Sequence, residues 1–375
     1  MTLIKGAFDV AGRVVVKVGS SLLIDAKGGV NDDWLRALAE DIVSLKSKGV
    51  DTIVVSSGAV AVGRRRLGLS TGLRLEQKQA ASAVGQTHLM NAWREAFEAT
   101  KLAPQVGQIL LTQSDTRDRR RYLNARGAID ALLDIGTMPI VNENDTVATA
   151  EIRYGDNDRL AAHTAEIAGA DLLVILSDVN GLYTANPSTD AGAAFLPVID
   201  KITPDIEAMA SGTSKEAGEG SGGMATKITA AKIAAASGCS TIIAPGTEDN
   251  PLSTLLAGGP GTFIRAGQSR EAARKVWIRN LQDAAGVVTV EEGAAAAITS
   301  GASLLPAGIL SIDGDFRRGD LVTICTPTGS VGRGLVAYDA PELARILGKK
   351  SDEAAQILGY RRRSAVVERN DLVVG

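Results

Sequence analysis

Aromatic residues are scarce in this chain, and so are cysteines. Phe, Trp and Tyr together make up 3% of the 375 residues, so the hydrophobic core must be built from Ala, Val, Leu and Ile. The two cysteines, Cys239 and Cys325, are far apart and have no partner at the spacing of a zinc or redox motif. They are typical of buried thiols in a reducing compartment.

The sequence also lacks the signals of a membrane-spanning or secreted protein. No apolar run approaches the roughly 18 residues that a membrane-spanning helix needs. The N-terminal segment Met-Thr-Leu-Ile-Lys-Gly has no apolar core followed by a cleavage site, so a cytoplasmic protein is expected. The net charge of −3 is not the basic excess that bulk nucleic-acid binding normally needs.

Short apolar segments alternate with amphipathic ones through most of the chain. The predicted strands lie at 13–18, 52–55, 106–112, 138–141, 172–176 and 240–244. The predicted helices lie at about 32–48, 74–99, 119–135, 158–168 and 224–237. This alternation predicts an α/β fold, a three-layer αβα sandwich whose mainly parallel central sheet is covered on both faces.

The pattern changes toward the C-terminus. From roughly 245 to 270 the chain is rich in Pro and Gly and has no clear periodicity. Beyond about 284, short strands are predicted at 286–290, 319–324 and 334–338, with a short helix near 341–347. We therefore expect a large domain over 1–270 and a small β-rich, barrel-like domain over 284–375.

Lys17 interrupts the apolar strand Val-Val-Val-Lys-Val near its carboxyl end. A buried lysine without a partner is costly, so its ammonium group is expected to point into a polar site. The alternative is an edge-strand lysine that reaches the surface, and the Gly19-Ser20-Ser21 segment that follows argues against it. The spacing is not that of a P-loop, so that mechanism is not implied.

A second lysine, Lys227, follows the glycine-rich segment Gly220-Ser221-Gly222-Gly223-Met224-Ala225. The segment fits the dinucleotide pattern Gly-x-Gly-x-x-Ala, but no clear strand precedes it and it comes late in the chain, so an NAD site is rejected. It opens a predicted helix, whose N–H groups and positive dipole end favour phosphate. A lysine gains nothing from that dipole, which favours a functional role for Lys227.

Two clusters of carboxylate and amide side chains flank predicted strand ends. Asn142-Glu143-Asn144-Asp145 follows the strand at 138–141, and Asp156-Asn157-Asp158 caps the next helix. Such groups are costly at close range unless they are solvated, metal-bound or paired. A lone acidic loop is usually solvated, but two together at strand ends favour a site that binds an ammonium group and steers the lysines.

Two further polar pairs follow predicted strands. Ser57-Gly58 either supplies an N–H and a hydroxyl to a substrate carboxylate or forms an ordinary strand-to-helix turn, and this motif alone leaves both interpretations open. Ser177-Asp178 is expected to lie along a nucleotide base or ribose, with a simple turn as the alternative. Runs of arginine such as Arg64–Arg66 more often mark solvated faces than binding sites.

The two lysines and the glycine-rich segments beside them predict phosphoryl transfer to a small metabolite. Glycine lets backbone N–H groups approach phosphate oxygens closely, and a lysine at each end neutralises charge on the group in transit. The acidic and amide clusters would hold a small zwitterion.

These segments together resemble the glutamate 5-kinase family, a branch of the amino-acid kinase family whose members carry a C-terminal PUA domain. The likeness spans nearly the whole chain and includes Val-Lys-Val-Gly-Ser-Ser, Val-Asn-Glu-Asn-Asp-Thr-Val-Ala, Gly-Asp-Asn-Asp and Gly-Gly-Met-Ala-Thr-Lys. Other amino-acid kinases share the lysines but not the Asn-Glu-Asn-Asp segment. The C-terminal Gly-Asp-Phe-Arg-Arg-Gly-Asp resembles the PUA module, a fold otherwise associated with RNA.

The resemblance implies a role for each candidate residue. The catalytic group would be Lys17, Lys227 and Asp158, with Asp158 orienting the two lysines. The residues that would contact ATP are Lys17, Ser177, Asp178, Ser221, Gly222, Gly223, Met224, Ala225, Thr226 and Lys227. The residues that would hold glutamate are Ser57, Asp145 and Asn157, with Asn142 and Glu143 nearby. Ser177 and Ser221 stand where threonine is expected, and each keeps a hydroxyl.

The implied reaction is ATP-dependent phosphorylation of the L-glutamate side-chain carboxylate to L-glutamyl 5-phosphate, the first step of proline synthesis. Mg²⁺ would be bound by the nucleotide phosphates, and no residue of the protein is assigned as a metal ligand. One alternative is a related kinase that acts on aspartate, acetylglutamate or carbamate. An alternative of a different class is an RNA-binding protein that acts through the C-terminal module, which the acidic charge balance disfavours.

The resemblance also implies partners beyond the two substrates. A homo-oligomer is expected, with L-proline as a feedback inhibitor and hand-over of the product to glutamyl phosphate reductase. For the C-terminal module we prefer a regulatory or assembly role over RNA binding.

Overall fold

The computed structural model describes residues 3–25, 29–149, 154, 156–212, 223–281, 283–359 and 364–375. The chain divides into two compact units, an N-terminal unit of Met1–Gln268 and a C-terminal unit of Ser269–Gly375.

A single mixed sheet forms the centre of the N-terminal unit. Within the described residues its eight strands lie in the order β3-β4-β2-β1-β5-β7-β8-β6. All neighbours pair in parallel except β7 with β8, so the predicted mainly parallel sheet is confirmed. The strands are β1 (Arg13–Val18), β2 (Asp51–Ser56), β3 (Val106–Leu111), β4 (Met138–Glu143), β5 (Leu172–Ser177), β6 (Val198–Ile199), β7 (Ser240–Pro245) and β8 (Thr262–Ile264).

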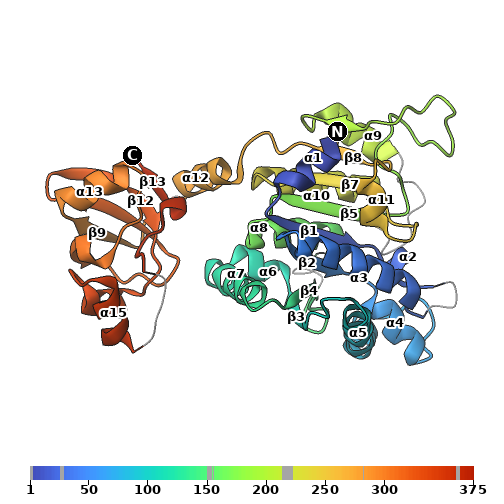
Figure 1. Cartoon of the computed structure of the whole chain (residues 1–375), viewed down its shortest axis with the longest axis horizontal. Coiled ribbons are helices and arrows are strands. Elements are labelled where there is room, and N and C mark those ends of the chain that lie inside the picture. The colour runs from blue at the N-terminus through green and yellow to red at the C-terminus, as the bar shows by residue number, and fades with distance from the viewer. Residues whose placement is uncertain are drawn as a thin grey trace. The chain divides into compact units, whose positions relative to one another are not determined.

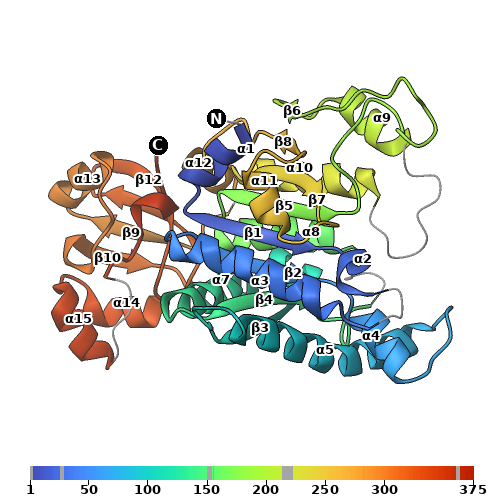
Figure 2. The ribbon, with the colours of Figure 1, turned by 45° about the vertical axis from the view of Figure 1, so that its right-hand side comes forward.

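Helices cover both faces of this sheet, which gives the three predicted layers (Figure 1 and Figure 2). On one face lie α1 (Leu3–Val10), α2 (Ser20–Leu23), α3 (Asp32–Ser47), α5 (Leu75–Glu98) and α11 (Pro251–Leu256). On the other lie α6 (Gln113–Arg117), α7 (Arg119–Asp134), α8 (Asn157–Ala168) and α10 (Met224–Ala236), with α9 (Pro204–Gly212) packed on α10. The two cores are aliphatic and rich in alanine, as the shortage of aromatic residues predicts.

The predicted elements that carry strong periodicity are found within two residues of their expected ends. Strand β4 continues to Glu143, so Asn142 and Glu143 belong to the strand and not to the loop after it. The segment at 245–270, which shows no clear period in the sequence, contains α11 and β8. The short helices α1, α4 (Ala59–Arg66) and α6 also went unpredicted, because so few turns leave little periodic signal.

The C-terminal unit contains a separate small sheet. Within the described residues its five strands lie in the order β10-β9-β11-β12-β13 around a core of its own. The strands are β9 (Gly286–Val290), β10 (Ile309–Asp313), β11 (Leu321–Thr326), β12 (Gly329–Leu335) and β13 (Leu372–Val374). The helices are α12 (Arg270–Asn280), α13 (Glu292–Thr299), α14 (Ala340–Ile346) and α15 (Ser351–Leu358), with single 3₁₀ turns at Pro306–Gly308 and Arg369–Asp371. The predicted strand at 334–338 is wrong in its position, because the hairpin partner of β11 ends at Leu335.

Two glycines let α4 and α5 cross in backbone contact. A Cβ atom added to Gly63 would lie 1.7 Å from the carbonyl oxygen of Ala81, and one added to Gly85 would lie 1.8 Å from that of Ala59. Only a residue without a side chain allows so close an approach. Because α4 begins directly after Ser57-Gly58, this crossing fixes the loop at the carboxyl end of β2 against α5.

We expect Gly63→Ala to lower the free energy of unfolding by about 2–3 kcal/mol, because the helices must separate to admit a methyl group. Gly127→Ala is the matched control, since a Cβ atom at Gly127 in α7 would meet nothing within 4 Å. Alanine there should leave stability unchanged or raise it by up to ~1 kcal/mol through helix propensity. Thermal unfolding of both variants checks this, and equal melting temperatures would contradict the close crossing.

Candidate active site

Strand periodicity places Lys17 on the face of the sheet that α8 covers. Val14, Val16 and Val18 pack into the core shared with α3 and α5, whereas Val15 packs into the core shared with α7, α8 and α10. Because successive side chains in a strand alternate between the two faces, Lys17 lies on the same side as Val15. Its side chain therefore leaves the carboxyl end of β1 on the side of α8.

Helical periodicity brings two further charged side chains to the same place. Asp158 in α8 stands three residues before the buried Ala161, and Lys227 in α10 stands three residues before the buried Ala230. Residues at this spacing share one face of a helix, so both charged residues continue the core-facing side of their helices. Each sits in the first turns of its helix, where that face reaches the carboxyl edge of the sheet.

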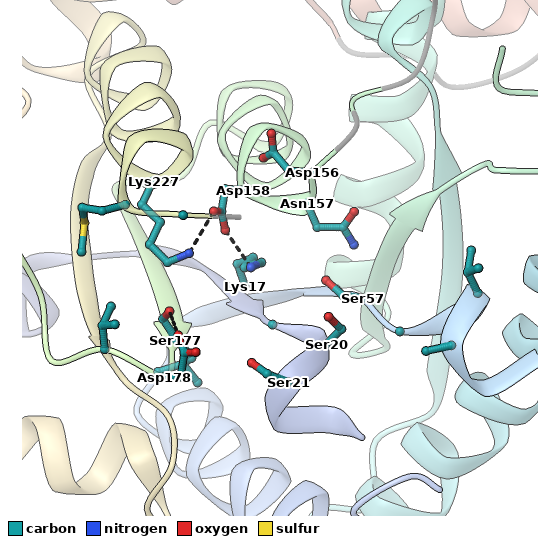
Figure 3. A pocket seen from close by; sticks show the side chains of 18 of the residues that line it. Lys17, Ser20, Ser21, Ser57, Asp156, Asn157, Asp158, Ser177, Asp178 and Lys227 are labelled. Carbon is teal, nitrogen blue, oxygen red and sulfur yellow. Dashed lines mark hydrogen bonds and ion pairs between the residues drawn. The ribbon is translucent and has the colours of Figure 1, made fainter. Parts of the chain in front are cut away.

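Both lysines converge on Asp158 (Figure 3). Lys17 Nζ lies 2.7 Å from Asp158 Oδ1, and Lys227 Nζ lies 3.1 Å from Oδ2. The hydroxyl of Thr226 donates a hydrogen bond to Oδ2 at 2.8 Å. Asp158 is fully buried, and Lys17 and Lys227 are only 6% and 4% exposed. Two positive charges against one negative charge leave an excess positive charge that an anionic ligand would neutralise.

The charges in this cluster shift one another's pKa values. Burial alone would raise the pKa of Asp158, but the attraction of Lys17 and Lys227 outweighs it and lowers that pKa below its ordinary value. Burial lowers the pKa of Lys227; Asp158 partly offsets this, and repulsion from Lys17 adds to it. Burial also raises the pKa of the neighbouring Asp156, which caps α8 by accepting the N–H of Arg159 at 2.8 Å.

The cluster lies in a cavity of about 1320 Å³ at the carboxyl edge of the sheet. This is where ligands bind in open α/β sheets. Figure 3 shows Ser177 and Asp178 on one side of the two lysines, and Ser57 and Asn157 on the other. The cavity therefore has two ends, with the lysines and Asp158 between them.

The end near Ser177 and Asp178 suits a nucleotide. Ser177 Oγ donates to Asp178 Oδ1 at 3.0 Å, and the loop that follows β5 supplies further lining residues, among them Tyr183 and Asn186. The first turn of α10 also lines this cavity through Met224. A helix begins with main-chain N–H groups that lack partners within the helix, so this turn can donate hydrogen bonds to phosphate oxygens.

The opposite end presents amide and carboxylate groups. Asn157 Nδ2 donates to the carbonyl oxygen of Ser56 at 2.7 Å and to Asn142 Oδ1 at 3.0 Å. Asp145 Oδ2 accepts a hydrogen bond from Ser82 Oγ at 2.8 Å. Asn142, Asp145, Asn157 and Ser57 all line the cavity, so this end can bind a small molecule that carries an ammonium group.

The structure brings most of the predicted site residues into this one cavity. Its lining includes Lys17, Ser57, Asn142, Glu143, Asp145, Asn157, Asp158, Ser177, Asp178, Gly223, Met224 and Lys227. Ala225 and Thr226 are not among the lining residues. The hydroxyl of Thr226 nevertheless donates a hydrogen bond to Asp158, which does line the cavity. Ser221 and Gly222 lie outside the described residues. The catalytic and binding roles of the whole set remain predictions.

Two cations that line the cavity were missed in the sequence. Arg64, taken together with its neighbours as part of a solvated face, is half-buried and lines the cavity, while Arg65 and Arg66 are exposed. Lys78, in the first turn of α5, also lines it. Arg64 had no clear local signal, because α4 has too few turns to show which side of it is buried. Lys78 had no local signal.

Known proteins and family models are similar to this chain over long segments. Among solved structures, carbamate kinase from Giardia lamblia bound to AMP-PNP aligns with 68% of this chain and 99% of its own at 19% identity, with a TM-score of 0.49. The model of the amino acid kinase family matches residues 12–245, and the model of the PUA domain matches residues 286–358.

Relatives with assigned names align over almost the full chain. A Rhizobium etli protein named glutamate 5-kinase is 53% identical over 364 residues, which cover 96% of this chain and 92% of that one. Glutamate 5-kinase 1 of Rhizobium meliloti is 51% identical and covers 100% of this chain and 95% of its own. This chain belongs to the glutamate 5-kinase branch of the amino acid kinase family.

Membership of the glutamate 5-kinase branch accounts for the order of the two units. The amino acid kinase match lies within the N-terminal unit, and the PUA match lies within the C-terminal one. The C-terminal unit extends beyond the PUA match on both sides, because α12 precedes it and β13 pairs with β12 after it. Across the described residues, no helix has the length and apolar character to cross a membrane.

We expect Asp158→Asn to lower the free energy of unfolding by about 3–5 kcal/mol at pH 7, because it removes the carboxylate that both buried ammonium groups share. The folded-state pKa of Asp158 is lowered, so its contribution is present above the unfolded value of about 3.9 and is lost as the pH falls through the folded value. The gap in melting temperature between wild type and variant should therefore persist from pH 7 to pH 5 and narrow only below about pH 4.

Asp156→Asn is the matched control two residues away, because asparagine caps a helix as well as aspartate does and the change should cost less than about 1 kcal/mol. A gap for Asp158→Asn that is absent at pH 7, or equal at pH 7 and pH 3, would contradict the ion-pair account.

Proposed function

We propose that the protein transfers the γ-phosphoryl group of ATP to the side-chain carboxylate of L-glutamate, giving L-glutamyl 5-phosphate for proline synthesis. The convergence of Lys17 and Lys227 on the two oxygens of Asp158, between the two ends of one cavity, carries this proposal. Relatives named glutamate 5-kinase at 51% to 53% identity over nearly the full chain support glutamate as the acceptor.

The protein itself needs to form no covalent bond in this reaction. A carboxylate is already ionised and nucleophilic at neutral pH, so no general base is needed. Catalysis then rests on aligning the two substrates and on stabilising the charge of the group in transit. Lys17 and Lys227 supply that charge, and Asp158 holds both ammonium groups at one point, so little reorganisation is required when the phosphoryl group arrives.

The nucleotide is assigned to the end that Ser177 and Asp178 line, with its phosphates toward Gly223 and the first turn of α10. Both oxygens of Asp158 are already engaged by cations, so this carboxylate does not suit a metal ion. Among the described residues, no group of three or more His, Cys, Asp and Glu side chains is arranged to hold one. We assign Mg²⁺ to the nucleotide phosphates, whose charge it would neutralise.

Glutamate is assigned to the opposite end. Asp145 and the oxygen of Asn157 would accept hydrogen bonds from its ammonium group, with Asn142 and Glu143 nearby, and Ser57 with the following N–H groups would bind its α-carboxylate. The side-chain carboxylate would then point toward the two lysines. We assign this chemistry to a catalytic domain over 1–270.

We further propose that the C-terminal domain over 284–375 serves regulation or assembly. Self-association, feedback inhibition by L-proline and hand-over of the product to glutamyl phosphate reductase complete the proposal, and family membership supports all three.

We expect Lys17→Ala and Lys227→Ala each to lower kcat by on the order of 10²–10³, by analogy with the loss of one transition-state donor. Purified protein with MgATP, glutamate and hydroxylamine should yield the hydroxamate of the acyl phosphate, and aspartate, acetylglutamate and carbamate in place of glutamate test the related acceptors. Lys232→Ala is the matched control, because Lys232 lies on α10 in an exposed ion pair with Glu207. Near-normal turnover in both lysine variants would refute the mechanism, and product only with another acceptor would refute the substrate.

A further inference from the structure

Helix α5 reaches the acceptor end of the cavity through two buried polar side chains, Ser82 and Gln86. Ser82 Oγ donates to Asp145 Oδ2 at 2.8 Å, and Gln86 Oε1 accepts from Asn142 Nδ2 at 2.9 Å. The two residues are four positions apart, so they lie on one face of the helix. They are only 3% and 9% exposed. Neither lines the cavity, but each holds a side chain that does.

Main-chain groups fix the orientation of the two asparagine amides without ambiguity. The N–H of Glu143 donates to Asn142 at 2.8 Å, so the accepting atom must be the oxygen, and Nδ2 of Asn142 must face Gln86. The carbonyl oxygen of Ser56 accepts from Asn157 at 2.7 Å, so the donating atom must be Nδ2.

These orientations leave an oxygen of Asn157 for the ligand. Both hydrogens of Asn157 Nδ2 are used, one by Ser56 and one by Asn142. Within the described residues no group donates to Asn157 Oδ1, and Asn157 lines the cavity. This oxygen and the carboxylate of Asp145 are both hydrogen-bond acceptors, which suit an ammonium group.

Gln86 acts through its oxygen alone. Its Nε2 is buried and has no hydrogen-bond partner in the part of the chain that the structure describes. Its Oε1 satisfies the buried Nδ2 of Asn142, which would otherwise be an unpaired donor inside the protein. An unpaired donor of this kind is costly enough to make Asn142 turn away, and Asn157 would then lose one of its two partners.

We propose that Ser82 and Gln86 are positioning residues of α5 that orient Asp145, Asn142 and Asn157 toward the ammonium group of the acceptor. This inference rests on the proposed function, because it concerns how that site recognises glutamate.

The experiment compares Gln86→Met, which removes the acceptor oxygen, with Gln86→Glu, which keeps it. For each variant we would measure the KM for glutamate and for ATP, the melting temperature, and the inhibition constant of glutarate, which is glutamate without the ammonium group. Gln79→Met is the matched control, since Gln79 lies on the same helix and donates to a main-chain carbonyl outside the amide network.

Gln86→Met should raise the KM for glutamate about tenfold, the cost of one unpaired buried donor, and leave the KM for ATP and the glutarate constant within about twofold. Gln86→Glu should keep the glutamate KM within about twofold although its buried carboxyl lowers the melting temperature. Gln79→Met should leave all three constants unchanged. Ser82→Ala, which removes the hydroxyl that bonds to Asp145, should raise the glutamate KM alone.

Three results would overturn the inference while the wild type still forms the acyl phosphate. One is an unchanged glutamate KM in Gln86→Met, or in Ser82→Ala if the first variant does not fold. Another is a rise in the glutarate constant equal to the rise in KM, which indicates a general disturbance of the pocket. The third is an equal defect in Gln86→Glu, which indicates that shape and not the acceptor oxygen matters. A wild type that forms no acyl phosphate would refute the proposed function instead.

Discussion

One buried carboxylate holds two buried ammonium groups in this protein, and the proposed chemistry depends on that interaction. Without Asp158 the positive charges of Lys17 and Lys227, both buried side chains, would repel each other. With Asp158 present, both ammonium groups form ion pairs with one carboxylate, and the three groups together keep one excess positive charge. Two ammonium groups held by one carboxylate can exist without a ligand and still attract an anion, because the ligand supplies the second negative charge.

The surrounding fold determines where that interaction forms. Alternation along β1 turns Lys17 toward α8, and helical spacing turns Asp158 and Lys227 toward the same edge of the sheet. Small residues allow the close packing that this requires, alanines where α8 and α10 face the sheet and Gly63 and Gly85 where α4 crosses α5. The same crossing brings α5 against the acceptor end of the cavity. Small residues in the core therefore let several helices and strands approach closely enough to place their side chains in one site.

Much of the fold and of the candidate site was predictable from the sequence, because both follow from local periodicity. The strand around Lys17, the helices that begin near Asp158 and Lys227, and the polar residues at strand ends all carry a pattern within a few residues of themselves. The parts that were missed depend on contacts distant in sequence. Nothing near Gln86 indicates that its oxygen meets Asn142, and nothing near Lys78 indicates a cavity. Helix α4 is too short for a clear period, and so the partial burial of Arg64 was missed.

The central claim is that both lysines act on the one phosphoryl group. A crystal structure of the protein with MgADP, aluminium fluoride as a mimic of the group in transit, and glutamate tests this most directly. The account predicts that Lys17 Nζ and Lys227 Nζ both lie within hydrogen-bonding distance of the fluoride ligands or the oxygens flanking them, with Asp158 still between the two lysines. A complex in which either ammonium group stays directed away from the mimic, with glutamate bound in line, would contradict it.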